Sequence, residues 1–360
     1  MNETANIFVQ VIKSTDVVVV GVGLLFILIG IAVGVFKQIW FISGMDAMPK
    51  EKWLRFIPIA ILMATVINVK TFAQGELVIT DTNSGLRLSA INKEFPVLKL
   101  LLPNQSDSER GIEIEFPEHV TGVNNRSGQL EHLYHLYLES TANSTNRVLG
   151  PVWTINDNTL VYETTLKDNM KMVACAKLDS IGIKFSYTFT NQSDNSYQHL
   201  QAITCVQLYS FFADTLLERT YIHTDNGFDI MASETPERLS MPLDEWLPCR
   251  YHVSYNWPIP NIKKEKGQDS IMKYYRSIKA NYPFIATLSH DRTWVAATFT
   301  TQTGNLWTNP ERSCHHVDPE ISLIRPNEIK TIRLTTFVYE GNLNMIFNYL
   351  DEDKKRYVGE

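Results

Sequence analysis

The hydrophobic pattern of the chain changes near residue 74, from long apolar runs to strict alternation. Residues 17–36 read VVVVGVGLLFILIGIAVGVF and contain no charge. About 20 such residues suffice for a helix to cross a bilayer. A second, shorter apolar run extends from Ile57 to Val69. We therefore expect one or two N-terminal apolar helices in residues 1–73, followed by a separate domain at 74–360.

The second apolar run has two interpretations. Lys50, Lys52 and Arg55 precede it, and the small residue Ala73 follows it. This order is typical of a secretory signal peptide, in which case 57–73 is cleaved and Met48, rather than Met1, is a plausible start. Otherwise the run is a second membrane helix. Both interpretations place the basic loop in the cytoplasm and the rest of the chain outside it. We expect a bacterial cell-envelope protein, anchored in the membrane or exported to the periplasm or the extracellular side.

After residue 74 the alternation predicts β-strands. Between Ile181 and Thr190, apolar residues occupy every second position, and the polar turn 191–196 follows. Many strands separated by turn clusters favour a large antiparallel β-sandwich. The expected strands are 77–80, 86–92, 112–116, 160–165, 170–179, 181–190, 198–209, 284–289, 294–300 and 328–340. Short helices are expected at 269–278 and 342–356.

Composition excludes little beyond disorder and nucleic-acid binding. The net charge is −6, and no basic stripe is present, so a nucleic-acid partner is not expected. The four cysteines are scattered without a CxxC pair, which argues against a structural zinc ribbon and for buried thiols. No cofactor and no metal are predicted.

Two stretches resemble known families. Residues 182–212, GIKFSYTFTNQSDNSYQHLQAITCVQLYSFF, resemble the central strand pair of galactose-mutarotase-like domains. The resemblance implies a β-supersandwich that binds sugar rings in a cleft on one concave sheet. Residues 294–350, with NPERSCHHVDP, are similar to uncharacterised exported bacterial proteins. Residues 36–53 resemble a loop of small bacterial multi-helix membrane proteins of unknown function, and this likeness implies no chemistry.

The chain departs from the mutarotase pattern at one position that matters. Such domains carry a catalytic histidine in the second strand, where this chain has Cys205, Val206 and Gln207. Epimerisation needs an acid and a base on opposite sides of the sugar. The departure argues against simple mutarotation and leaves Gln207 as a sugar contact. If the chain is an enzyme, a lyase or glycosidase-like role is favoured.

The segment 312–320, RSCHHVDPE, concentrates reactive side chains. Adjacent histidines on extended backbone point to opposite faces, so His315 and His316 should not bind one ion. Three interpretations stay open: a structured loop in which Asp318 caps backbone N–H groups, a functional loop at a cleft edge with His315 or His316 as acid or base, and a metal site.

Two further groups of residues are candidates. On the segment 131–140, His132 and Tyr134 share a strand face and form a possible base and acid for β-elimination. An ordinary amphipathic strand explains the same pattern. Glu113 and Glu115, beside Glu118, form a carboxylate pair that nothing in the sequence singles out.

Aromatic residues gather in the irregular segment 244–261. Trp246, Tyr251 and Trp257 could form a stacking platform for sugar, together with Trp307. Packing against the sandwich edge is the alternative. We expect an extracytoplasmic carbohydrate-binding domain, with a non-catalytic envelope interaction module as the main alternative and a metal-dependent hydrolase as the third.

Overall fold

The computed structural model describes residues 77–91, 95–136, 151–257, 259 and 261–351, all within one compact unit, Glu76–Glu360. The apolar helices expected at 17–36 and 57–69, and the expected boundary at residue 73, lie outside these described residues and stay predictions. In the described part of the chain, no helix is long and apolar enough to cross a membrane.

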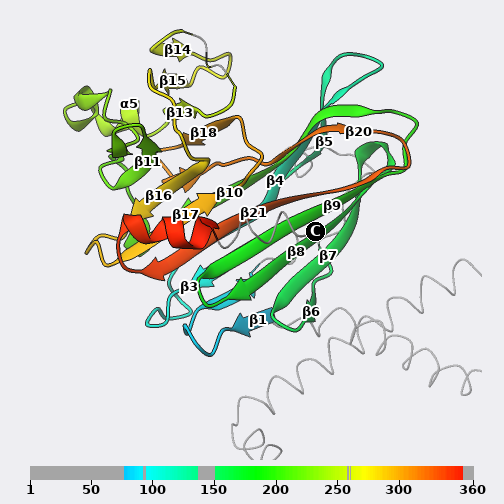
Figure 1. Cartoon of the computed structure of the whole chain (residues 1–360), viewed down its shortest axis with the longest axis horizontal. Coiled ribbons are helices and arrows are strands. Elements are labelled where there is room, and N and C mark those ends of the chain that lie inside the picture. The colour runs from blue at the N-terminus through cyan, green and yellow to red at the C-terminus, as the bar shows by residue number, and fades with distance from the viewer. Residues whose placement is uncertain (1–76, 92–94, 137–150, 258, 260, 352–360) are drawn as a thin grey trace, which may run out of the picture. The chain divides into compact units, whose positions relative to one another are not determined.

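The described strands form two large antiparallel sheets and one small sheet (Figure 1). The first large sheet has eight strands: β1 (Leu77–Thr80), β2 (Arg87–Ala90), β3 (Val97–Leu101), β4 (Ile112–Asn124), β10 (Tyr197–Leu208) and β19 (Cys314–His315) in order, with β5 (Leu130–His135) paired to β4 and β20 (Glu320–Ile324) paired to β10. The second has nine: β12 (Gly227–Ile230), β11 (Thr220–Thr224), β16 (Phe284–Leu288), β17 (Trp294–Phe299), β21 (Ile329–Glu340), β9 (Gly182–Asn191), β8 (Met170–Asp179), β7 (Thr159–Leu166) and β6 (Thr154–Asn156).

The two large sheets share a core. Along β9, Phe185, Tyr187 and Phe189 are buried while the residues between them are half-buried, as the alternation predicts. The Tyr187 hydroxyl lies 2.6 Å from Oγ1 of Thr204 on β10 in the facing sheet. Burying each such aromatic stabilises the fold by about 1.5–3 kcal/mol. The predicted large antiparallel sandwich is therefore confirmed in its sheets and their facing core.

The small sheet has four strands and stands at one end of the sandwich (Figure 1). Its order is β14 (Lys264–Lys266), β15 (Met272–Tyr275), β13 (Arg250–Ser254) and β18 (Asn305–Thr308). The helix expected at 269–278 is wrong, because β15 occupies its centre. Two neighbouring strands pair with β15, and this pairing buries Tyr274 in a second core, which outweighs the local helical preference.

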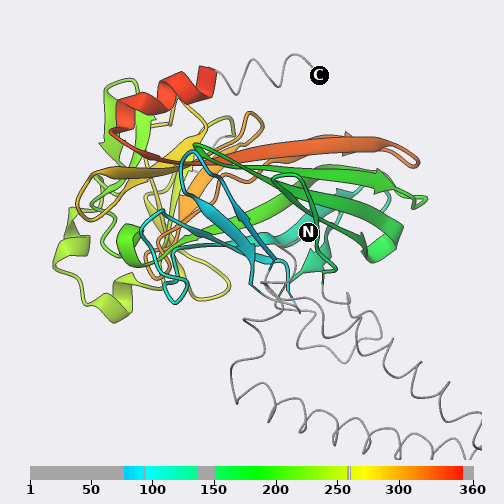
Figure 2. The same cartoon turned by 90° about the horizontal axis from the view of Figure 1, so that it is seen from below.

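In the described part of the chain, helices are few and short. They are η2 (Lys167–Asn169), η3 (Ser210–Phe212), η4 (Pro236–Leu239), α5 (Leu243–Trp246) and η5 (Leu343–Met345), the last leading into a helix at 346–351. This last helix, coloured red, covers the outer face of the nine-stranded sheet (Figure 2). Ile346 and Leu350 are buried there against a cluster that includes Phe337. The helix expected at 342–356 is confirmed as far as residue 351.

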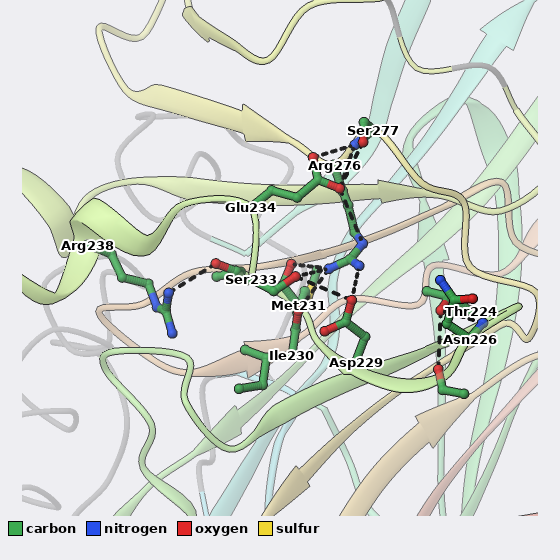
Figure 3. A network of polar contacts seen from close by, with 12 residues as sticks. Thr224, Asn226, Asp229, Ile230, Met231, Ser233, Glu234, Arg238, Arg276 and Ser277 are labelled. Carbon is green, nitrogen blue, oxygen red and sulfur yellow. Dashed lines mark hydrogen bonds and ion pairs between the residues drawn. The ribbon is translucent and has the colours of Figure 1, made fainter.

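A buried arginine connects the small sheet to the β11–β12 hairpin (Figure 3). The Arg276 side chain is only 1% exposed and pairs with Asp229. Its Nη1 donates to the carbonyl of Ile230 and to Oγ of Ser233, at 2.8 Å in each case. Glu234 accepts from the backbone N–H of Ser277 beside it. This network holds the small sheet against the sandwich.

Candidate functional site

A cavity of about 230 Å³ opens where the eight-stranded sheet meets the segments that flank the small sheet. Its walls combine charged, amide and thiol groups with a few apolar side chains. The lining residues are Glu118, Cys205, Leu247, Pro248, Arg250, Ile271, Asn309, Glu311, Arg312 and His316. Of the residues predicted to form a site, only His316 lies in this wall.

A bulge in β4 turns Glu118 toward the cavity. Opposite β10, the register jumps from Cys205↔Glu115 to Ile203↔His119, so β4 carries extra residues at this point. Bulges of this kind re-aim side chains and are common beside functional sites. As a result, one carboxylate oxygen each of Glu115 and Glu118 and Sγ of Cys205 all lie within 4.8 Å of one another.

The pairing of β10 with β19 adds two more reactive side chains. Val206 lies opposite His315 and Gln207 opposite Cys314, so the strand direction carries His316 toward Cys205. Sγ of Cys205, Sγ of Cys314 and one ring nitrogen of His316 lie within 4.8 Å of one another. All three residues are buried. This group has the donor atoms that a soft or borderline divalent metal prefers.

His316 is held by stacking on Trp307. The two ring centroids are 3.5 Å apart and the ring planes differ by 12°. Trp307 Nε1 donates to Oδ2 of Asp318 at 2.9 Å, and Oδ1 of the same carboxylate lies 3.5 Å from Nδ1 of His316. The other ring nitrogen, Nε2, lies 4.0 Å from the Glu118 carboxylate. The imidazole is thus fixed in orientation, with Asp318 on one side and the cavity carboxylate on the other.

The same stacking continues across the small sheet. His252 lies opposite Trp307 on one side and opposite Tyr275 on the other. Its ring stacks at 5.8 Å from Trp307 and at 5.3 Å from Tyr275. Trp307 also forms an isolated bridge with His316, so a row of four rings connects the small sheet to the cavity wall.

His315 points to the other face, as the extended backbone predicts. Its Nε2 lies 2.8 Å from the hydroxyl of Thr287, and its Nδ1 lies 3.2 Å from that of Thr298. Burial lowers the pKa of this imidazole to about 3. His315 is therefore a neutral core histidine between two threonines, and the acid or base role expected for it is not supported.

Burial shapes the charges around the cavity. It raises the pKa of Glu118 to about 7, although the nearby His316 acts in the opposite direction. Burial alone would raise the pKa of the Cys314 thiol, but a hydrogen bond with Cys205 and the charge of His316 hold it well below its ordinary value. Burial alone would lower the pKa of His316, but Cys314 and Asp318 raise it well above its usual range. The two side chains therefore shift each other's pKa in opposite directions across this contact.

Gln207 does not line the cavity. It is 3% exposed, and its Nε2 donates to Oε1 of Glu115 at 2.7 Å. The hydroxyl of Tyr209 donates to its Oε1 at 2.5 Å. Arg312 lies 3.6 Å from the same oxygen of Glu115. Gln207 thus serves to hold a buried carboxylate behind the cavity wall, rather than to contact a ligand directly.

The aromatic platform expected in 244–261 does not form. Trp246 and Tyr251 are 0% and 1% exposed and pack in the second core, because the short helix α5 and strand β13 turn them inward. Trp246 Nε1 donates to the carbonyl of Thr215. Trp257 is half-buried and stands edge-on to His199, outside the cavity wall.

His132 and Tyr134 do not share a face. A second irregularity in the β4–β5 register lies between them, and it turns both Leu133 and Tyr134 inward. Tyr134 is 6% exposed in the main core, whereas His132 is exposed. The base and acid pair expected from simple alternation is therefore not assembled.

Sequence reasoning did not single out Cys205 or Glu118 as members of this site, although Glu118 stands beside the carboxylate pair Glu113 and Glu115. Cys205 was noticed only as the position where an expected histidine is absent. The position of Glu118 in the cavity wall depends on a bulge in β4, which the residue pattern does not predict. The scattered spacing of the cysteines was a usable signal, because it favoured buried thiols, and the structure shows all four cysteines free and three of them buried.

Comparisons with known proteins give likenesses of structure alone. No protein-family model and no curated protein matches the sequence. Among solved structures, the chain resembles the Slr1438 protein of Synechocystis, with 14% identity, a TM-score of 0.44, and coverage of 74% of this chain and 96% of that one. It also resembles a galactose mutarotase-like protein of Lactobacillus casei, with 11% identity, a TM-score of 0.43, and coverage of 74% and 100%.

A third likeness is to an alpha-N-acetylgalactosaminidase of Bifidobacterium bifidum, with 8% identity, a TM-score of 0.41, and coverage of 78% of this chain and 39% of that one. Galactose-mutarotase-like proteins are thus among the structures that this chain resembles, in line with the resemblance of residues 182–212 to such domains. At TM-scores below 0.5, these likenesses say nothing of its ligand or activity.

Proposed function

We propose that this chain is an extracytoplasmic carbohydrate-binding domain, and that one sugar unit occupies the cavity beside Cys205 and His316. The observation that carries the proposal concerns Asn309, which lines the cavity. Its side-chain amide oxygen is buried and has no hydrogen-bond partner among the described residues. A buried acceptor of this kind costs about 1–3 kcal/mol unless a partner satisfies it. A sugar hydroxyl is such a partner.

The rest of the lining supports a sugar over an apolar ligand. Arg250 and Arg312 supply fixed donors, and Glu118 and Glu311 supply acceptors. Ile271, with the apolar side chains beside it, offers the kind of surface that the C–H face of a pyranose needs. The volume of about 230 Å³ is below the roughly 300–1,000 Å³ typical of drug-sized ligands, which favours a single sugar unit or the end of a chain.

The test is calorimetric titration of the full chain, purified in mild detergent, with neutral and uronic monosaccharides and short oligosaccharides. We expect binding of one sugar class, and at least a tenfold loss in Asn309→Ala. Asn305→Ala is the matched control, because the Asn305 amide oxygen is also buried without a partner but lies outside the cavity wall. A flat panel with folded protein, or equal losses in both variants, would overturn the proposal.

A turnover assay with the same sugars separates binding from catalysis. The departure at Cys205, in the stretch where the resemblance to mutarotase-like domains implies a catalytic histidine, favours lyase or hydrolase chemistry over mutarotation.

A second candidate is a non-catalytic structural or interaction module of the cell envelope. The burial of Trp246 and Tyr251 favours it, since these rings are not open for stacking on sugar. A flat sugar panel would support this candidate.

The extracytoplasmic location is part of the same proposal and is supported by the apolar runs at 17–36 and 57–69 with basic residues between them. Protease treatment of intact cells and spheroplasts tests it, together with N-terminal sequencing of the mature chain. For a periplasmic domain we expect the 74–360 region to be digested in spheroplasts but not in intact cells. Protection in spheroplasts would contradict export.

A further inference from the structure

We propose that Cys205, Cys314 and His316 form a zinc site whose fourth position faces the cavity beside Glu118. The three ligands come from β10 and from β19 with the residue after it, two segments brought together only by the antiparallel pairing of those strands. This site goes beyond the proposed sugar binding and does not depend on it.

The spacing of the ligand atoms suits a tetrahedral ion. They lie within 4.8 Å of one another. In a tetrahedral zinc site with Zn–S bonds near 2.3 Å, ligand atoms are roughly 3.3–3.8 Å apart. The upper limit of 4.8 Å on the observed separations is compatible with this range. Two thiolates and one imidazole select zinc over calcium or magnesium, which prefer oxygen ligands.

His316 gives an independent indication of a ligand. The residue is 0% exposed, yet neither of its ring nitrogens has a hydrogen-bond partner among the described residues. A buried polar side chain is normally satisfied, and an unpaired one calls for an explanation such as a missing ion. A zinc ion bound to Nε2 supplies the partner that the protein does not.

The surroundings of His316 resemble the support that metal-binding histidines usually have. Such a histidine commonly donates its second N–H to a carboxylate, which fixes the ring and its tautomer. Here Asp318 Oδ1 lies 3.5 Å from Nδ1, and Trp307 holds both partners, by stacking on His316 and by donating to Asp318. Asp318 Oδ1 has no other partner in the described part of the chain.

The cavity explains why we assign an open fourth position. Structural zinc sites are closed by four protein ligands, whereas catalytic sites keep three and leave one for water or substrate. Cys205 and His316 both line the cavity, and Glu118, also in its wall, lies 4.0 Å from Nε2 of His316. If the proposed sugar binding is correct, an ion at this position would contact a hydroxyl of the bound sugar, and this extension alone rests on the proposed function.

The test measures zinc in the full chain in detergent. The protein is stripped with a chelator, and zinc chloride is titrated in competition with a chromophoric chelator. We expect one zinc per chain, at least hundredfold weaker binding in Cys205→Ser and Cys314→Ser, and a roughly 10–100-fold loss in Asp318→Asn. Cys249→Ser is the matched control, because Cys249 is also buried but lies in the second core.

Cobalt(II) provides a measurement that needs no variant to fold. Cobalt bound by two thiolates gives intense near-ultraviolet charge-transfer absorption, which is expected in the wild type. The proposal is overturned if the cobalt complex shows no thiolate band, or if the cysteine variants bind zinc as tightly as the control. It is also overturned if a Cys205–Cys314 disulfide persists after purification with reductant, because the two sulfurs are then not available to bind an ion. Zinc binding with a flat sugar panel supports the metal site and rejects only the sugar proposal.

Discussion

Trp307 and His316 form a face-to-face ring pair at 3.5 Å that joins the small sheet to the wall of the cavity. The pair depends on two kinds of contact, ring stacking and the hydrogen bond from the indole N–H to Asp318. These contacts can be separated by mutation.

The variant Trp307→Phe keeps a ring for stacking but removes the donor to Asp318. That carboxylate is 9% exposed, so loss of its partner leaves a largely buried acceptor unsatisfied. We expect the free energy of unfolding to fall by about 1–3 kcal/mol, measured by urea titration. Trp294→Phe is the control, because the Trp294 indole N–H makes no hydrogen bond among the described residues. Equal losses in both variants would show that ring volume alone matters.

Much of this architecture could be predicted because alternation reports burial directly. The strand 170–179 is found with its exact bounds, and β9 differs by one residue at each end. The opposite orientations of His315 and His316 also follow from extended backbone alone. Helix prediction at 269–278 failed because the pairing that makes β15 a strand comes from residues elsewhere in the chain.

The site could be predicted only in part, because strand pairing and bulges assemble it. Cys205 and Cys314 are far apart in the sequence, and only the β10–β19 register brings them together. Glu118 reaches them through an irregularity in β4. For the aromatic residues of 244–261, the prediction of a sugar-stacking surface was wrong. Trp246 and Tyr251 are residue types that stack on sugars, but both are buried in the core, and sequence composition does not distinguish these two roles.

The burial of His252 should make the stability of the fold depend on pH. Burial lowers its pKa to about 3, helped by the nearby charges of Lys273 and Arg250, whereas an unfolded histidine titrates near 6.5. Between these values the unfolded state binds the extra proton, so stability is lost as pH falls below about 6.5. The contribution is about 2 kcal/mol between pH 7 and pH 5.

The variant His252→Phe keeps a ring between Tyr275 and Trp307 but removes the titration. Urea unfolding at pH 7 and pH 5 should show a smaller drop for this variant than for the wild type. His290→Phe, at an exposed position, should drop as the wild type does. A variant with the same pH slope as the wild type would refute the buried neutral state of His252.

Arg276→Met tests the network of Figure 3. The guanidinium is nearly fully buried and satisfies the Ile230 carbonyl, Ser233 and Asp229. Removing one partner of a buried ionic group costs about 3–5 kcal/mol, and the partial exposure of Asp229 places the expected loss near the lower end. Arg126→Met, at an exposed turn, should change the free energy of unfolding by less than about 0.5 kcal/mol. A small loss for Arg276→Met would mean that water replaces the guanidinium.

Gln207→Leu tests whether this residue supports the cavity wall through Glu115. The glutamine is buried and donates to the carboxylate at 2.7 Å, so its removal leaves Glu115 with one donor fewer. We expect the free energy of unfolding to fall by about 2 kcal/mol, measured by urea titration.

Gln201→Leu is the matched control on the same strand, because Gln201 donates to Glu320 at 3.1 Å but is only half-buried. Its expected loss is below about 1 kcal/mol, since water can replace a partly exposed donor. If Gln207 instead contacts the ligand directly, sugar affinity will fall while stability stays unchanged, and calorimetry on the same two variants distinguishes these cases.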